Sequence, residues 1–98
     1  MFYASYEENG KKVGHLFESY ADFLKEVGTA SPIDIVDFKT TGRSYSEKKE
    51  SVRKVAQEFQ SVECGGMYMS EYADVSGWFR LMGERYGLSA EFEREGVI

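Results

Sequence analysis

The sequence has little of the chemistry from which catalytic and metal sites are built. Its 98 residues include one cysteine, Cys64, and one histidine, His15. A single cysteine cannot form an internal disulfide, and a lone thiol suits a reducing compartment. Two such residues on separate predicted elements do not supply the three or four ligands that a zinc site needs. We therefore expect a protein without a bound metal or cofactor.

Long hydrophobic runs are also absent. No run reaches the roughly 18 apolar residues that a membrane-spanning helix requires. The start, MFYASYEENGKK, lacks the basic patch and apolar run of a secretion signal. With 42% hydrophobic and 30% charged residues, the composition is typical of a globular domain. We expect one domain over residues 1–98, located in the cytoplasm and without membrane contact.

The net charge of −5 is unevenly distributed along the chain. Residues 31–66 carry six acids and six bases, whereas the two flanking regions together carry eleven acids and six bases. An acidic protein repels the phosphate backbone at long range, which disfavours general nucleic-acid binding. Such a charge balance is better suited to a basic protein surface.

The first element is a predicted β-hairpin. Asn9 and Gly10 accept the positive φ values of a two-residue turn, and the flanking residues alternate as half-buried strands do. The register that follows pairs Glu8 with Lys11, and it runs to Phe2 opposite Phe17.

A helix and a third strand are predicted next. Ser19 can cap a helix that Gly28 ends, with an apolar stripe expected to lie on the hairpin: Tyr20, Phe23, Leu24 and Val27. After Pro32, the β-branched segment IDIVDFKT predicts a strand, with Ile33 and Ile35 buried and Val36 and Phe38 as further core candidates.

Three more helices follow in the prediction. Ser44 and Glu47 have capping-box spacing at the start of a basic helix over residues 44–63, which ends before Gly65 and Gly66. Its buried stripe is Val52, Val55, Ala56, Phe59 and Val62.

GMYM, residues 66–69, is a candidate strand. A third helix buries Val75, Trp78, Phe79, Met82 and Tyr86 up to Gly87, and a fourth runs from Ser89 to Gly96. The expected fold class is α+β: a hairpin and one or two further strands in a small sheet, packed against three to four helices.

No catalytic constellation emerges from these elements. His15 is the only good candidate for a base, and no serine lies in a GxSxG turn. Ser46 and Lys49 have SxxK spacing outside any useful context. For His15 and Cys64, structural roles are favoured over a proton-transfer or nucleophilic role. We therefore expect a protein that is not an enzyme; the enzymatic alternative would require activity that depends on His15 or Cys64.

Aromatic residues, by contrast, are abundant: seven tyrosines, seven phenylalanines and one tryptophan. Some tyrosines must lie at the surface of so small a domain, where tyrosine anchors protein interfaces or closes the edges of the core. Together with nearby acids they predict a partner-binding face that consists of Tyr68, Glu71, Tyr72, Asp74, Glu84 and Glu91.

The basic segment between Asp37 and Lys54 supports an alternative. It carries six of the twelve bases of the chain, and these could bind RNA beside Tyr45 or form the solvated side of a helix. The alternative RNA-binding or protein-interaction set is Lys39, Arg43, Tyr45, Lys48, Lys49, Arg53 and Lys54.

The ending WFRLMGERYGLSAEFEREGVI resembles the ends of small acidic accessory proteins from mobile elements of Gram-positive bacteria, and anti-CRISPR inhibitors are among these. The resemblance includes the aromatic pair Trp78 and Phe79 and the segment Arg85–Leu88. It implies a non-enzymatic inhibitor that binds stoichiometrically to a CRISPR or restriction nuclease, blocking the nucleic-acid or guide-RNA surface. The resemblance identifies no functional motif, so it assigns no site residue.

Overall fold

The computed structural model describes residues 1–28, 31–62 and 68–98. Three strands, β1 (Phe2–Glu8), β2 (Lys11–Phe17) and β3 (Asp34–Asp37), form an antiparallel sheet in the order β2-β1-β3. Four helices accompany the sheet: α1 (Tyr20–Val27), α2 (Tyr45–Ser61), α3 (Met69–Tyr86) and α4 (Ser89–Glu95). The predicted α+β class is confirmed.

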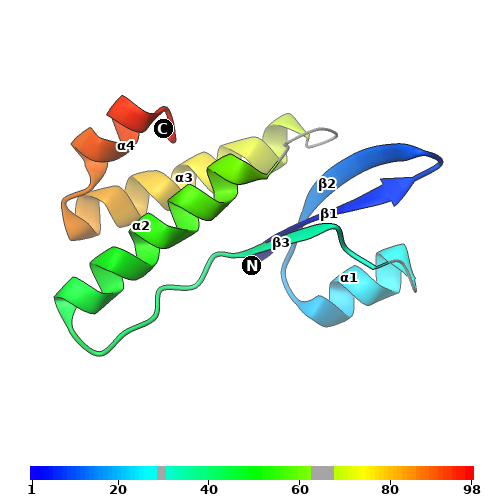
Figure 1. The fold of residues 1–98 in the computed structure, drawn as a ribbon, viewed down its shortest axis with the longest axis horizontal. Coiled ribbons are helices and arrows are strands. Elements are labelled where there is room, and N and C mark those ends of the chain that lie inside the picture. The colour runs from blue at the N-terminus through cyan, green and yellow to red at the C-terminus, as the bar shows by residue number, and fades with distance from the viewer. Residues whose placement is uncertain (29–30, 63–67) are drawn as a thin grey trace.

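The molecule is elongated, measuring 41 × 27 × 20 Å. The sheet and α1 form one end, while α2, α3 and α4 pack together at the other (Figure 1). The predicted hairpin register is confirmed from the Phe2–Phe17 pair to the Glu8–Lys11 pair, and Asn9 has the positive φ of 52° that the turn needs.

Most predicted helix boundaries agree with the structure. Ser19 and Ser44 each accept a hydrogen bond from the backbone N–H three residues later, as N-caps do. Gly28, Gly87 and Gly96 follow α1, α3 and α4 with positive φ. The candidate strand at residues 66–69 is wrong where it can be checked, because Tyr68 caps α3 and Met69 begins it. Gly65, Gly66 and Cys64 lie outside the described residues.

Strand β1 is central and is buried on both faces. Tyr3 packs edge-on to Phe59 of α2 at 5.9 Å between ring centroids, inside a core that also contains Val36, Phe38 and Phe79. The predicted stripe of α2, from Val52 to Val62, is buried in this core. We call this side of the sheet the helical face.

The opposite side, which we call the α1 face, has a smaller core. Phe2, Ala4, Tyr6 and Phe17 pack there against Phe23 of α1. Two burial predictions are wrong on this side. Within the predicted stripe of α1 only Phe23 is fully buried, while Tyr20 and Leu24 are 53% and 44% exposed. Ile33 and Ile35 are also about half exposed, because β3 is an edge strand and α1 does not cover it.

Candidate functional site

A hollow of about 370 Å³ lies where the hairpin meets the start of α3. Four elements line it: β1, β2, α1 and α3. We call it the tyrosine hollow, and its lining residues are Tyr6, Glu8, His15, Leu16, Glu26, Tyr68 and Glu71.

Glu71 accepts hydrogen bonds from three other residues that line the hollow. Its Oε1 accepts a hydrogen bond from His15 Nδ1 at 2.9 Å, and its Oε2 accepts one from the backbone N–H of Leu16 at 2.5 Å. It also reaches back to the backbone N–H of Tyr68, as a glutamate at the third helical position can do. Burial alone would raise the pKa of Glu71, but these hydrogen bonds outweigh burial and lower it. Glu71 is therefore a carboxylate that fastens α3 to β2.

Two tyrosines enclose the histidine of the hollow. The Tyr68 ring lies 5.2 Å from the His15 ring, and the Tyr6 ring lies 6.2 Å from it. Tyr6 is buried, whereas Tyr68 is 67% exposed. Tyr68 therefore offers a large aromatic face to a partner, which is the arrangement found in interface anchors.

The electrostatic environment of the hollow is negative. Burial and then the carboxylates of Glu8, Glu26 and Glu71 raise the pKa of the Tyr6 hydroxyl. Glu8 and Glu26 are exposed, and neither forms an ion pair with another described residue. A lysine or arginine side chain of a partner could lie between these acids and the Tyr68 ring, gaining ion-pair and cation–π energy.

The predicted acidic and aromatic set is distributed over several surfaces. Tyr68 and Glu71 line the tyrosine hollow, although Glu71 is only 16% exposed at its side chain and is already occupied by hydrogen bonds. Tyr72 and Asp74 are two residues apart on α3, so they project about 200° apart around the helix axis. The structure therefore does not bring the set together as one face.

Glu91 of the acidic and aromatic set forms an ion pair with Arg53 of the alternative basic set. Its Oε2 lies 2.9 Å from Arg53 Nε, and Arg53 also pairs with Glu50. The hydrogen bond from Arg53 lowers the pKa of Glu91, and the two side chains are only 23% and 28% exposed. This ion pair links α2 to α4, so each of its charges neutralises the other.

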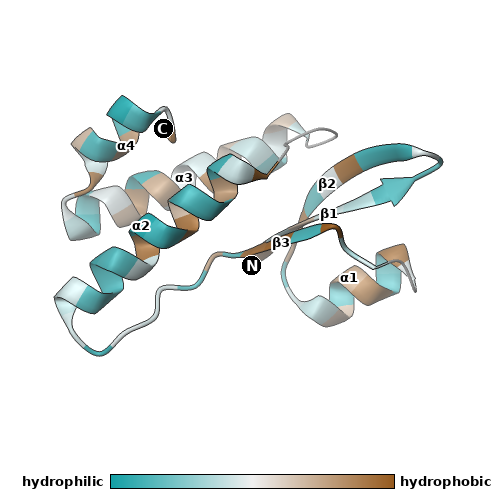
Figure 2. Ribbon diagram, in the orientation of Figure 1, coloured by the Kyte–Doolittle hydropathy of each residue, from teal (hydrophilic) through white to brown (hydrophobic). Residues whose placement is uncertain are grey.

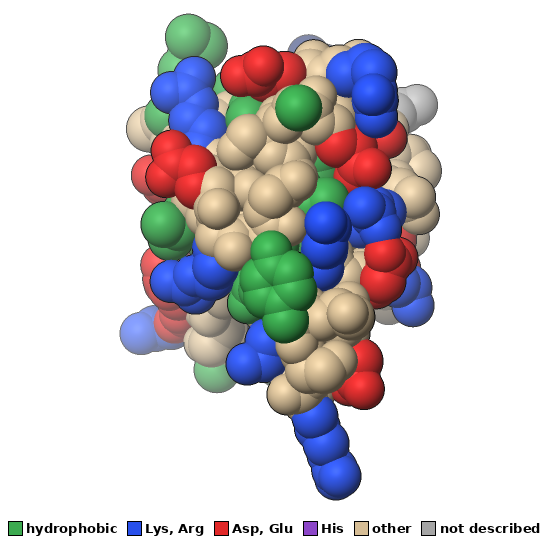
Figure 3. Space-filling model, turned by 90° about the vertical axis from the view of Figure 1, so that its left-hand side faces the viewer, with side chains coloured by type: hydrophobic (Ala, Val, Ile, Leu, Met, Phe, Trp, Pro, Cys, Tyr) green, Lys and Arg blue, Asp and Glu red, His purple; other side chains and the backbone are tan. Residues whose placement is uncertain are grey.

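The remaining bases do not form a continuous positive surface. Lys39 pairs with Asp37 at 3.3 Å, and Lys48 and Lys49 are half-buried. Tyr45, 58% exposed, packs its ring on Tyr86 at 5.4 Å. Figure 3 shows the end of the molecule where α2 begins, with Lys and Arg side chains interspersed with Asp and Glu. Arg43 and Lys54 are exposed in this mixed environment, which is typical of a solvated helix face.

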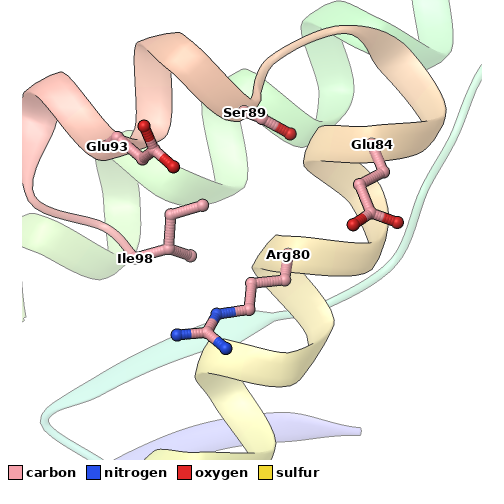
Figure 4. Close-up of a pocket in the computed structure, with 5 residues that line it drawn as sticks. All are labelled: Arg80, Glu84, Ser89, Glu93 and Ile98. Atoms are coloured by element: carbon pink, nitrogen blue, oxygen red, sulfur yellow. The ribbon is translucent and has the colours of Figure 1, made fainter.

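A second charged hollow, of about 360 Å³, lies between α3 and α4 (Figure 4). Glu84 of the predicted set lines it together with Arg80, Ser89, Glu93 and Ile98. Both signs of charge are present, and the charged side chains are exposed to solvent. The tyrosine hollow instead combines several acids with the exposed ring of Tyr68, so it remains the better candidate.

Comparison with family models, curated proteins and solved structures finds no match to this chain. Among the described residues, no three His, Cys, Asp or Glu side chains are grouped so that they could hold a metal ion. No helix in this part of the chain has the length and apolar character needed to cross a bilayer.

The predicted partner-binding set missed five members of the hollow: Tyr6, Glu8, His15, Leu16 and Glu26. One signal was present, because the hairpin register places Tyr6, Glu8 and His15 on the same face of the sheet. The approach of α3 to β2 depends on Glu71 reaching a strand 55 residues earlier. No local pattern encodes that contact.

Proposed function

We propose that this protein is a small non-enzymatic binding protein that acts by stoichiometric occupation of a basic protein surface. The observation that carries the proposal is the tyrosine hollow, where the exposed ring of Tyr68 shares the lining with Glu8 and Glu26, two exposed carboxylates that form no ion pair with another described residue. An aromatic anchor bordered by charge of one sign favours a partner that presents lysine or arginine.

The partner class that we propose is a host defence nuclease, in the manner of an anti-CRISPR inhibitor. The channel of a nuclease that holds nucleic acid or guide RNA is basic, so an acidic protein can compete there. The resemblance of the last quarter of the chain to accessory proteins of mobile elements supports the same class. Because −5 is a modest net charge, competition would depend on the local acids of the tyrosine hollow.

The experiment uses paired variants with equal changes of charge. Glu26→Lys reverses an acid at the hollow, and Glu58→Lys reverses an exposed acid on α2 far from it in sequence. Capture from a bacterial lysate, followed by mass spectrometry and titration calorimetry on the captured nuclease, should show at least about tenfold weaker binding for Glu26→Lys only. Equal loss in both variants would show that net charge acts without a specific site.

A second pair tests the aromatic anchor. Tyr68→Ala should weaken capture by about tenfold or more, while Tyr45→Ala, which removes an exposed tyrosine on α2, should leave it unchanged. If the captured partner is RNA, and a double Lys49→Glu, Lys54→Glu variant abolishes capture with a steep dependence on salt, the alternative based on the basic helix replaces this proposal.

A further inference from the structure

The Tyr6 hydroxyl is a polar group of the tyrosine hollow without a partner in the described chain. Tyr6 is only 8% exposed, yet its hydroxyl forms no hydrogen bond with another described residue. The oxygen is not sealed in the core, since the described side-chain oxygen that is sealed without a partner belongs to Ser5. A largely buried hydroxyl without a partner costs free energy. The Tyr6 hydroxyl is therefore available to a ligand that enters the hollow.

Three carboxylates from three elements act on this hydroxyl. Burial raises the pKa of the Tyr6 hydroxyl, and the negative charges of Glu8 on β1, Glu26 on α1 and Glu71 on α3 raise it further. The hydroxyl therefore stays protonated at about pH 7, and its oxygen can accept a hydrogen bond. The turn end of the hairpin, where Glu8 lies, is hydrophilic (Figure 2). Among the described residues, no lysine or arginine lines the hollow, so its acids face a cation from outside.

The rings of Tyr6, His15 and Tyr68 form the aromatic part of the same hollow. The His15 ring centroid lies 6.2 Å from that of Tyr6 and 5.2 Å from that of Tyr68. A cation is attracted to an aromatic face when it lies within about 6 Å of the ring centroid. Long basic side chains also lay their alkyl stems along apolar surfaces. A ligand with a positive head and an alkyl stem therefore matches both parts of the hollow.

The arrangement of acceptors favours an ammonium group over a guanidinium group. A guanidinium prefers two parallel hydrogen bonds to one carboxylate. Glu71 is the least exposed of the three acids, and both its oxygens already accept hydrogen bonds from β2. The remaining acceptors are the Tyr6 hydroxyl, Glu8 and Glu26, and these come from more than one element. An ammonium group has three donors that point in different directions, which suits separate acceptors.

We propose that the tyrosine hollow binds one unmethylated lysine side chain of the partner, with the Tyr6 hydroxyl oxygen as an acceptor for its ammonium group. The ammonium group also meets the carboxylates of Glu8 and Glu26, and the alkyl stem of the lysine lies along the Tyr68 ring. This inference rests on the proposed function, since it names the chemical group by which the hollow recognises a basic partner. It gives the buried Tyr6 a binding role beside that of the exposed Tyr68.

The probe is the peptide acetyl-Gly-Lys-Gly-amide, titrated into the isotope-labelled protein and followed by NMR at low salt. We expect saturable binding with a Kd below about 10 mM and the largest shifts at residues that line the hollow. The same peptide with arginine in place of lysine should bind at least about threefold more weakly, because a planar fork does not match the separate acceptors. A trimethyllysine version should also bind at least about threefold more weakly, because it has no N–H donors.

A pair of tyrosine variants isolates the hydroxyl. Tyr6→Phe removes the hydroxyl and keeps the ring, and it should weaken binding of the lysine peptide by at least about fivefold. It should not lower the midpoint of urea unfolding, because the hydroxyl has no partner in the described chain. Tyr86→Phe is the matched control, since Tyr86 is 6% exposed and lies at the far end of α3 from the hollow. This control should leave peptide binding unchanged.

Three outcomes would overturn the inference. They are no saturable binding of the lysine peptide at about 10 mM, equal binding of the trimethyllysine peptide, and unchanged lysine binding in Tyr6→Phe. The last two would show that charge and rings act without the hydroxyl.

The same measurements separate this inference from the proposed function. If Glu26→Lys and Tyr68→Ala weaken capture of the partner while Tyr6→Phe has no effect on lysine binding, the proposed function stands and the lysine site is refuted. If Tyr6→Phe weakens lysine binding but Glu26→Lys and Tyr68→Ala leave capture unchanged, the lysine site stands and the proposed function is refuted.

Discussion

On the helical face of the sheet, Tyr3 and Val36 lie under α2 and α3 and are at most 1% exposed. On the α1 face, the helix of eight residues covers Phe2 and Ala4 but leaves Ile33 and Ile35 about half exposed. One side of the same small sheet is thus closed by two long helices, and the other is only partly covered by a short one.

This difference separates stability from binding. The helical face gathers most of the buried apolar side chains of the described chain, and burial of such area is the main favourable term in folding. The α1 face keeps apolar side chains in contact with water beside an open strand edge. A surface of that kind costs little to leave exposed in small patches and is available to a partner.

The strongest test of this comparison truncates the centre of the helical core. Phe79 is fully buried, and its ring centroid lies within 5.8 Å of the ring centroids of Phe38, Phe59 and Phe92. Phe79→Ala should lower the free energy of unfolding by about 3–5 kcal/mol in urea denaturation. Phe23→Ala should cost less because the core of the α1 face is smaller and the exposed side chains of Tyr20 and Leu24 can move towards the cavity. A greater loss for Phe23→Ala would reverse the assignment of the two faces.

The next test overpacks the junction between the sheet and α2. An added Cβ on Gly14 would lie 1.8 Å from the Tyr3 hydroxyl oxygen, and Tyr3 is fully buried. Gly14→Ala should therefore destabilise the fold by about 1–3 kcal/mol, measured by thermal and urea unfolding. Gly77→Ala is the matched control, because nothing lies within 4 Å of its added Cβ and alanine favours a helix. Similar destabilisation by both would contradict the packing of Tyr3 over Gly14.

A third test removes the charge that fastens α3 to β2. Because the pKa of Glu71 is lowered from 4.5 in the folded chain, its carboxylate stabilises the fold above pH 4.5, and this contribution is lost as the pH falls below that value. Glu71→Gln should cost about 1–2 kcal/mol at pH 7 and should flatten the loss of stability in acid. Glu84→Gln, at an exposed acid on the same helix, should change neither quantity. An unchanged acid profile in Glu71→Gln would refute the role of Glu71.

The smallest effect is expected on the uncovered side of α1. Leu24 is 44% exposed and lies outside both cores. Leu24→Gln should change the free energy of unfolding by less than about 0.5 kcal/mol in urea denaturation. A loss above about 1 kcal/mol would mean that α1 buries more of its apolar stripe in solution than the structure shows.

Local rules were sufficient for most of the fold. The Asn9-Gly10 turn determines the hairpin register because a two-residue loop allows few pairings. Ser19 and Ser44 mark helix starts because their hydroxyl oxygens satisfy backbone N–H groups that have no partner within the helix. The errors at Ile33 and Ile35 have a different origin: the pattern predicts a strand, but strand order decides whether its side chains are covered.

The amino-acid sequence alone determined the type and order of the elements, since capping, turn formation and helical spacing act over a few residues. Only the tertiary structure decided which charges remain available. It joined Arg53 to Glu91 across 38 residues and engaged Glu71 with β2. Within the described part of the chain it left Glu8 and Glu26, which line the same hollow as Tyr68, without an ion pair. The physical reason is that ion pairing and exposure depend on distances between segments far apart in the chain, and packing of the whole core sets those distances.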